Sequence, residues 1–380
     1  MGSWMSMDEA CTRLGVRPQT VYAYVSRGKI EVMSDPADTR RSLYRAEDVA
    51  TLARRKQAGR KHETLATNTL FGAEPSIPTA ISTFVRERLY LRGQDAVTLA
   101  ARATLEEAAQ LLWDSGQPVD FSSSVKVARP GRVAAFRTLA ELAATGHSTH
   151  GRMKRVLQVE GQALVGQLAN AFGAQPGQHP LHLRFAQGWG QTPAVAELLR
   201  TAMVLLVDHE LTSSAFATRI TASTGASLPA CLLSGLTTLS GPLHGDASGR
   251  VKALFDELER QGEDQVIAHY LSTGQPLAGF GHHLYPEGDP RATMLLAMFK
   301  PPAVIARFIE KATRLTGLQP NIDVALAALS THYGLPDDAA FGMFATARSI
   351  GLLAHSLEQL GVGQVIRPRG RYVGVLPDKG

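Results

Sequence analysis

The chain has few cysteines and no apolar run long enough to cross a membrane. Cys11 and Cys231 are the only two cysteines among 380 residues, which argues against a disulfide framework or a zinc site. No stretch approaches the roughly 20 apolar residues of a membrane helix. The first residues, MGSWMSMDEACTRLG, are acidic where a secretory signal would be basic and then apolar. We therefore expect a cytoplasmic protein that does not enter a membrane.

The sequence also lacks an internal repeat, a glycine-rich phosphate loop and a cluster of metal ligands, so we predict no metal and no bound cofactor. Its composition, 44% hydrophobic and 19% charged, is globular, and its length suits two or three domains. The positive charge is uneven, because residues 1–65 hold 12 Lys or Arg against 8 Asp or Glu while the remainder is almost balanced. This asymmetry indicates a small basic module on a nearly neutral body.

The first part of the chain shows the signals of two short helices followed by two strands. Ser6 and Glu9 have the spacing of a capping box, and Gly15 suits the end of the first helix. Pro18 suits the first turn of the second helix. A polar turn separates two short strands, and a third amphipathic helix ends in a basic run. We predict a module over residues 1–56.

This pattern resembles the helix-turn-helix of the MerR-like or excisionase-like winged group, in which the second helix enters the major groove and the wing touches the backbone. Helix-turn-helix shape alone is a weak signal of function, so the alternative is a module for assembly or docking with solvated arginines. Residues 57–75 are polar and are predicted to form a linker. The residues that the resemblance would place on DNA are Arg17, Gln19, Thr20, Tyr22, Arg40 and Arg41.

From residue 76 onward the dominant signal is helical periodicity. Apolar residues recur at helical spacing through most of this region, and alanine is frequent among them, which allows helices to approach closely. Alternation typical of strands appears only in the wing and near the C-terminus. We predict an all-α body of many packed helices.

Polar residues interrupt these apolar segments at turns and helix ends. Each has an ordinary explanation: a histidine hydrogen-bonded in a core, an aspartate capping a helix, or an arginine paired with a carboxylate. Together they suggest a site, because glycine-rich turns let the backbone approach a ligand while the side chains are partly desolvated. The residues concerned are His209, His244, His282, Asp289, Arg291, Asp323, Arg348 and Arg367.

Several motifs then occur in the order and approximate spacing of the citrate synthase family. They are LLVDHEL, GPLHG, GFGHHLYPEGDPRA, PNID and RPRGRYVG, and the resemblance covers residues 81–374. It implies a citrate-synthase-like domain over residues 76–380, made of a large and a small helical domain, with a mobile subdomain at roughly 185–290. It also implies a homodimer.

The resemblance implies condensation of an acyl-CoA with oxaloacetate to give citrate and free CoA, with acetyl-CoA as the expected donor. Asp323 would be the base, His244 would donate to the thioester oxygen, and His282 would polarise the ketone. Phe344 would line the site, and the backbone of Gly279, Phe280 and Gly281 would flank CoA. The oxaloacetate dianion would be held by His209, Arg291, Arg348 and, across the dimer interface, Arg367.

The sequence departs from the family pattern at four positions. Asp246 and Ser248 replace the usual glycine and asparagine after His244, Thr212 replaces an asparagine, and His283 replaces an arginine. We expect Asp246 to cap a helix over residues 249–261. If it faces the pocket instead, it should raise the pKa of His244.

These departures leave two alternatives to a citrate synthase. One is a 2-methylcitrate synthase that uses propionyl-CoA. The other is a sensor that binds oxaloacetate or acyl-CoA without turnover and regulates DNA through its N-terminal module, although a sensor would have no need of the base Asp323.

Overall fold

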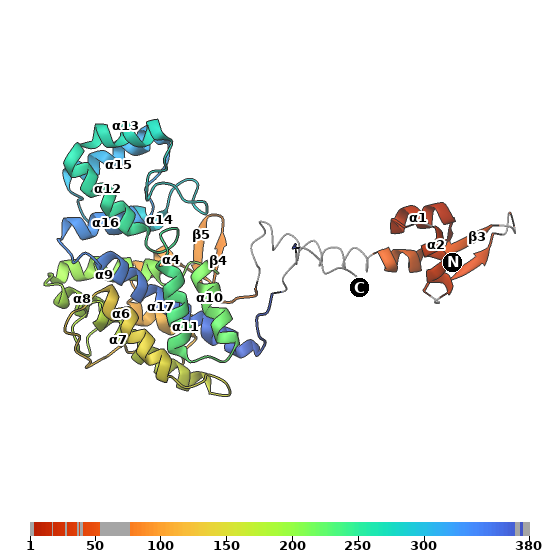
Figure 1. Cartoon of the computed structure of the whole chain (residues 1–380), viewed down its shortest axis with the longest axis horizontal. Coiled ribbons are helices and arrows are strands. Elements are labelled where there is room, and N and C mark those ends of the chain that lie inside the picture. Colours follow the sequence, from red (N-terminus) through yellow and green to blue (C-terminus); the bar gives the residue numbers. More distant parts are fainter. Residues whose placement is uncertain are drawn as a thin grey trace. The chain divides into compact units, whose positions relative to one another are not determined.

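The computed structural model describes residues 4–16, 18–26, 29–35, 38, 41–53, 77–368 and 373–374. The chain forms two compact units, residues 1–78 and residues 79–380 (Figure 1). The predicted boundaries, with a module over residues 1–56, a linker over 57–75 and a domain over 76–380, stay predictions.

The smaller unit contains a three-stranded antiparallel sheet of order β1-β3-β2 and short helices, among them α1 and α2. The predicted capping box is present, since Ser6 Oγ accepts from the Glu9 amide at 3.3 Å and the Ser6 amide donates to Glu9 Oε2 at 2.8 Å. Gly15 ends the first helix with a left-handed φ of 60°. Residues 46–53 are helical. The other elements are β1 (Trp4–Met5), α1 (Met7–Leu14), α2 (Pro18–Ser26), β2 (Val32–Ser34) and β3 (Ser42–Arg45).

The larger unit is helical, which confirms the predicted fold class. It also holds a small antiparallel sheet of β4 (Ser82–Val85), β5 (Arg88–Leu91) and β6 (Gln94–Asp95), which the sequence did not indicate. Its helices are α4 (Ala96–Ala100), α5 (Leu105–Trp113), α6 (Arg132–Thr145), α7 (Lys154–Ala171), α8 (Leu181–Gly188), α9 (Pro193–Leu206), α10 (Ser213–Ser223), α11 (Leu228–Leu239), α12 (Ala247–Gln261), α13 (Glu263–Thr273), α14 (Pro290–Ala297), α15 (Ala303–Thr316), α16 (Ile322–His332) and α17 (Ala339–Val362).

Helix α17 is the centre of this unit. It contacts α5, α7, α9, α10, α11 and α16, and most of its residues are buried. The indole of Trp113 donates to the carbonyl of Ile350 at 2.9 Å, which fixes α5 against its middle. A side chain surrounded by helices on this many sides cannot move without repacking its neighbours. Functional groups on α17 are therefore held rigidly.

The apolar residues of the larger unit form two cores. The first surrounds α17, whereas the second joins α12, α13 and α15 to the outer face of α16, and its residues run from Val251 to Ala328. In Figure 1 these helices gather at the top of the larger unit. The mobile subdomain predicted at 185–290 stays a prediction. The second core begins at Val251, inside that range, and extends beyond its end to Ala328. None of the described helices has the length and apolarity to span a membrane.

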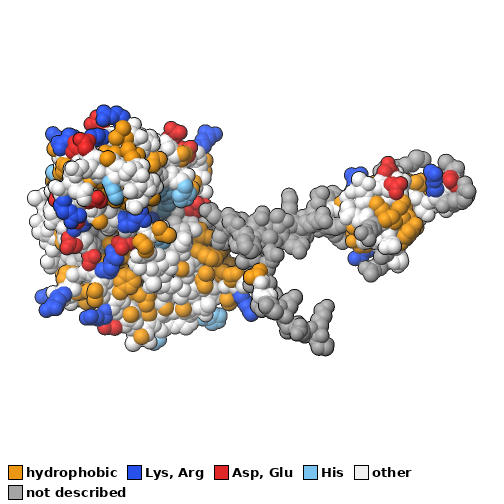
Figure 2. All heavy atoms as spheres, turned by 45° about the horizontal axis from the view of Figure 1, so that its top comes forward, with side chains coloured by type: hydrophobic (Ala, Val, Ile, Leu, Met, Phe, Trp, Pro, Cys, Tyr) orange, Lys and Arg blue, Asp and Glu red, His pale blue; other side chains and the backbone are white. Residues whose placement is uncertain are grey.

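Some apolar side chains of the larger unit face solvent. Val133 on α6 is 73% exposed, and Met153, Val156 and Val159 at the start of α7 are 58%, 40% and 66% exposed. Three-residue spacing places the α7 side chains on one helical face. Figure 2 shows that hydrophobic side chains also form patches on the visible side of the larger unit.

Candidate active site

Two of the predicted histidines meet in one aromatic cluster. His209 follows the last turn of α9, and its ring centroid lies 5.3 Å from that of His282, edge to face. Tyr285 joins them, since its hydroxyl is 3.2 Å from His209 Nε2 and its ring lies 4.9 Å from that of His282. Burial and neighbouring arginines lower the pKa of His209 well below its usual value, so its imidazole is neutral. Sequence reasoning missed Tyr285, although its place in the same glycine-rich turn was a usable signal.

A buried ion pair holds the first cation of the site. Asp289 accepts from Arg291 Nε at 2.9 Å and Nη2 at 2.8 Å, and it also accepts from the Ile322 amide at 3.0 Å. Burial favours the neutral acid, but Arg291 and these hydrogen bonds together lower the pKa of Asp289. The ionised carboxylate therefore fixes Arg291 and links the starts of α14 and α16. Arg291 and Tyr285 border a cavity of about 320 Å³.

Arg348 supplies a second buried cation. Only 2% of this residue is exposed, its Nε donates to the carbonyl of Leu206 at 3.0 Å, and its guanidinium lies 4.8 Å from the ring centre of Phe344. Burial lowers its pKa to about 10, which still leaves it charged near neutral pH. Its charge acts on His209, His244, Tyr285, Arg291 and Asp323, so these groups share one electrostatic environment.

His244 is positioned by its own turn and by α10. Its amide donates to Gly241 O at 2.9 Å, and its Nε2 lies 2.8 Å from Ser214 Oγ. A Cβ at Gly245 would lie 2.5 Å from Leu239, so only glycine fits the turn there. Burial lowers the pKa of His244 to about 4, so the ring is neutral. Sequence reasoning missed Ser214, which touches His244 from 30 residues away.

Two of the departures from the family pattern have a clear structural role. Thr212 caps α10 through the Ala215 amide, and its hydroxyl lies 3.1 Å from that of Ser214. The ring of His283 stacks on His282 with centroids 4.9 Å apart and planes 12° apart. Both replacements therefore support residues next to the site.

His282 is held in a defined tautomer by its own loop. Its Nδ1 accepts from the Leu284 amide at 3.1 Å, which leaves Nε2 to carry the proton. Burial lowers the pKa of His282 to about 4, with Arg291 acting in the same direction. Gly279 and Gly281 have left-handed φ values of 81° and 77°, which favour glycine. A Cβ at Gly279 would also lie 2.6 Å from Val251 and Val324.

Asp323 lies in the first turn of α16 but does not cap it. Asn321 is the cap, since its Oδ1 accepts from the Asp323 amide at 3.0 Å. Asp323 Oδ1 is shielded from solvent and has no hydrogen-bond partner among the described residues. Burial raises the pKa of this carboxyl to about 7, with Arg291 opposing the rise. A carboxylate that is unpaired and titrates near neutrality is suited to accept a proton.

Arg367 does not join the site within one chain. It is exposed, and the amide of the preceding Ile366 donates to Ser223 Oγ at 3.0 Å. Ser223 closes α10, whereas Ser214 near its start touches His244. The two serines are nine positions apart along α10, about 13.5 Å along the helix axis.

The structure places only some of the residues predicted to touch DNA. Arg17 and Arg40 lie outside the described residues. On α2, Gln19 and Tyr22 are exposed and Thr20 is half-buried. Arg41 forms a 3.5 Å ion pair with Asp38.

The expected role of Asp246 as a side-chain cap is wrong. Helix α12 begins at Ala247, and Asp246 precedes it without a capping hydrogen bond from its side chain. Its carboxylate instead binds Arg132 at the start of α6. Ser248 is buried, and its Oγ has no hydrogen-bond partner within the described part of the chain. Within that part, no three His, Cys, Asp or Glu side chains group as metal ligands.

The helical fold and this group of histidines, arginines and an aspartate define a class of protein. Comparison with known protein families identifies that class. Residues 131–369 match the model described as citrate synthase, C-terminal domain, and residues 4–57 match a helix-turn-helix domain. The chain belongs to the citrate synthase family and carries an N-terminal helix-turn-helix domain.

Individual relatives agree. The chain is 34% identical over 209 residues to putative citrate synthase 2 of Mycobacterium tuberculosis, a match that covers 51% of this chain and 56% of that one. The aligned segment thus spans little more than half the length of this relative. Citrate synthase 2 of Bacillus subtilis is 27% identical over 352 residues, covering 79% of this chain and 94% of the relative.

Solved structures share the fold. Citrate synthase from Thermotoga maritima superposes with a TM-score of 0.67 at 24% identity, covering 81% of this chain and 96% of that chain. A ternary complex of Thermoplasma acidophilum citrate synthase with carboxymethyl coenzyme A and oxaloacetate superposes with a TM-score of 0.68 at 20% identity, covering 82% and 97%.

Proposed function

We propose that this protein condenses an acyl-CoA, with acetyl-CoA as the donor, with oxaloacetate to give citrate and free CoA. The observation that carries the proposal is the unpaired Asp323 carboxyl, with a pKa near 7, in one electrostatic environment with neutral His244 and the cation Arg348. A binding protein gains nothing from burying an unpaired carboxyl, because the desolvation costs stability. A catalyst gains a base.

In the first step, Asp323 removes a proton from the carbon next to the thioester carbonyl. The developing enolate oxygen accepts a hydrogen bond from His244. Since the Nε2 atom of that ring contacts Ser214, its Nδ1–H is the donor available to the substrate. A neutral imidazole is suited to this role, because it stabilises the oxygen without transferring a full proton.

In the second step, the enol carbon attacks the ketone of oxaloacetate and a carbon–carbon bond forms. His282 carries its proton on Nε2 and donates to the ketone oxygen as that oxygen becomes an alkoxide. Arg291, Arg348 and His209 hold the two carboxylates. Water then cleaves the citryl thioester and releases CoA. The loop of Gly279, Phe280 and Gly281 would flank the CoA thioester.

The site would be completed by a second copy of the chain. Within one chain, Ile366 is bound to Ser223 at the end of α10, whereas His244 contacts Ser214 near its start, so Arg367 would reach the dianion from a partner. The exposed apolar side chains of Met153, Val156 and Val159, which share one face at the start of α7, support a homodimer, because exposed apolar patches are typical of interfaces.

Propionyl-CoA is the second donor to test, since one methylene in a pocket is worth only about 1–3 kcal/mol. A thiol-release assay with acetyl-CoA and propionyl-CoA, each with and without oxaloacetate, separates the two activities. We expect faster release with acetyl-CoA. Faster release with propionyl-CoA would make the protein a 2-methylcitrate synthase.

A second candidate function rests on the helix-turn-helix match. The body would bind oxaloacetate or acyl-CoA and regulate DNA through residues 5–56, a basic segment. The test is a mobility-shift screen at low and high salt, with and without each ligand. Ligand-dependent, salt-sensitive binding would support this function. Absence of binding at low salt would leave the module structural.

A further inference from the structure

One face of α17 contacts three consecutive residues at the end of α9 and just after it, Leu206, Val207 and Asp208. Residues 348, 351 and 355 of α17 are spaced three and four apart, so they lie on a single helical face. The residues that they contact lead directly into His209. Two of the contacts are hydrogen bonds, Arg348 Nε to Leu206 O at 3.0 Å and Gly351 N to Val207 O at 3.0 Å. The third is an ion-pair contact of 3.3 Å between His355 Nε2 and Asp208 Oδ1.

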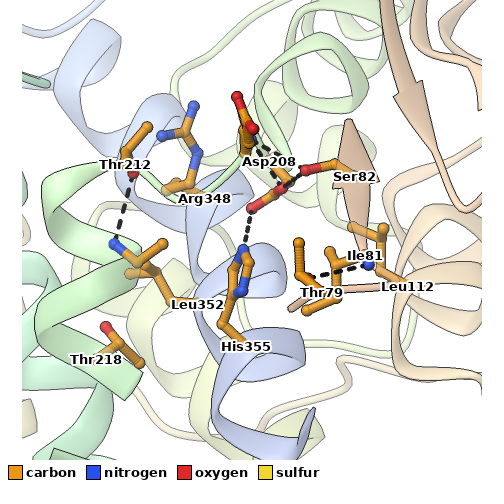
Figure 3. A network of polar contacts seen from close by, with 12 residues as sticks. Thr79, Ile81, Ser82, Leu112, Asp208, Thr212, Thr218, Arg348, Leu352 and His355 are labelled. Carbon is orange, nitrogen blue, oxygen red and sulfur yellow. Dashed lines mark hydrogen bonds and ion pairs between the residues drawn. The ribbon is translucent and has the colours of Figure 1, made fainter. Parts of the chain in front are cut away.

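Asp208 is the centre of this arrangement and is fully buried (Figure 3). Ser82 Oγ on β4 donates to its Oδ2, and the Glu210 amide donates to the same oxygen at 3.2 Å and to Ser82 Oγ at 3.0 Å. Glu210 has a left-handed φ of 65°, a strained conformation that only surrounding contacts can maintain. The carboxylate of Asp208 thus fixes the turn on both sides of His209.

The network continues from His355 to other helices. Its Nδ1 lies 3.4 Å from Arg219 Nη1 on α10, and Arg219 also binds Glu358 at 2.6 Å. Glu358 accepts from the Ala80 amide at 2.7 Å. Burial opposes ionisation of Asp208, yet His355, Arg348 and Ser82 together lower its pKa. A buried carboxylate that keeps its charge must keep its partners, so the network resists distortion.

We propose that Asp208 and His355 are positioning residues that set His209 and Arg348 in one fixed geometry for oxaloacetate. The proposal rests on the proposed function. His209 is the next residue after Asp208, and Arg348 is on the α17 face that contains His355. A shift of α17 along residues 206–209 would therefore move Arg348 away from His209, and the two residues could no longer bind the same oxaloacetate dianion. Displacement by 1 Å in a site can cost about 100-fold in rate.

Gly351 provides a second, independent way to test the contact between α17 and residues 206–208. A Cβ at this position would lie 2.4 Å from both Val207 O and Asp208 Oδ1, too close for any side chain. Gly161 on α7 is a matched helical glycine, because a Cβ there would meet its nearest atom, on Trp113, at 3.4 Å. Gly351→Ala should therefore disturb the oxaloacetate site, whereas Gly161→Ala should not.

The test compares Asp208→Asn and His355→Gln with His182→Gln, a control at another buried histidine. We expect the first two to raise the KM for oxaloacetate by about 10- to 100-fold while the KM for acyl-CoA changes less than about threefold. The double variant should be little worse than either single variant, because both break one network. His182→Gln should lower the melting temperature, but it should change the KM for oxaloacetate and the KM for acyl-CoA by similar factors.

Calorimetric titration with oxaloacetate separates failure of this inference from failure of the proposed function. Wild-type protein that binds no oxaloacetate would overturn both. Wild-type protein that binds, together with folded Asp208→Asn and His355→Gln variants that bind equally tightly, would overturn the inference alone. If Asp208→Asn does not fold, the inference is tested by comparing the oxaloacetate affinity of Gly351→Ala with that of Gly161→Ala. Equal affinity in those two variants would contradict the inference.

Discussion

Arg132 pairs with Asp246 through two hydrogen bonds, Nη1 to Oδ2 at 2.9 Å and Nη2 to Oδ1 at 2.7 Å. The Arg132 amide also donates to Asp338 Oδ2 at 2.9 Å, and its guanidinium lies 4.0 Å from the centre of the Phe341 ring. The negative charge that this chain carries two residues after His244 is thus neutralised by a cation from α6. That explains how an anion site tolerates it.

Replacing Asp246 by asparagine should therefore cost little. Both side chains of the pair are partly exposed, so we expect the free energy of unfolding to fall by about 1 kcal/mol or less. The KM for oxaloacetate should stay within about threefold of wild type, since the charge is already paired. Chemical denaturation and steady-state kinetics measure the two effects. A tenfold lower KM in the variant would show instead that the Asp246 charge repels the dianion.

Replacing Asp323 should abolish turnover without unfolding the protein. Asp323→Asn keeps the shape of the side chain but removes the base, and we expect kcat to fall by about 10²- to 10⁴-fold. Asp256→Asn, an exposed carboxylate on α12, is the control and should retain normal kcat. Circular dichroism confirms folding in both. A folded Asp323→Asn variant with near-normal kcat would refute the assignment of the base.

The pH dependence should report the same group. Burial raises the pKa of Asp323 to about 7, and the ionised form is the base, so kcat/KM should rise with pH up to about 7 and level off above it. His244 and His282, with pKa values of about 4, stay neutral across this range. A profile that is already flat from pH 5 upward would contradict the raised pKa.

Stability should change with pH in the opposite sense. Because the folded-state pKa of Asp323 is above the ordinary value of 3.8, the folded protein binds more protons between about pH 4 and 7. The stabilisation that this group contributes is therefore lost as pH rises through 7. Asp323→Asn should be more stable than wild type at pH 8, and the difference should shrink at pH 5. Thermal melts at both pH values test this, and an equal difference at both would contradict it.

The role of Arg367 can be tested by mixing two inactive variants. If Arg367 acts in the partner's site, a dimer of one Asp323→Asn chain and one Arg367→Gln chain contains one intact site. Random re-pairing should then restore about a quarter of the wild-type activity. Each variant re-paired with itself is the control. No recovery from a mixture that has exchanged subunits would mean that Arg367 acts within its own chain or not at all.

Local structure could be predicted where the signal was local. The capping box of Ser6 and Glu9 and the end of the first helix at Gly15 follow from neighbouring residues. Contacts between distant residues could not be read in this way. Asp246 and Arg132 are 114 residues apart, and Asp208 and His355 are 147 apart. Nothing near Asp246 reveals that an arginine on α6 removes it from its capping role.

The candidate site was predictable only through motif order. Spacing within one helix explains why Phe344 and Arg348 meet, but the approach of His209 to His282 depends on how α9 packs against the loop before α14. Tyr285 and Ser214 were missed because a tyrosine in a turn and a serine at a helix start have ordinary explanations. The small sheet of β4, β5 and β6 was missed because its strands are only two to four residues long.

Oxaloacetate-dependent release of free thiol from acetyl-CoA, measured with purified full-length protein, tests the central claim most directly. The account predicts release by the wild type that requires oxaloacetate and that falls by at least about 100-fold in Asp323→Asn. No release from either acetyl-CoA or propionyl-CoA by correctly folded wild-type protein would contradict it.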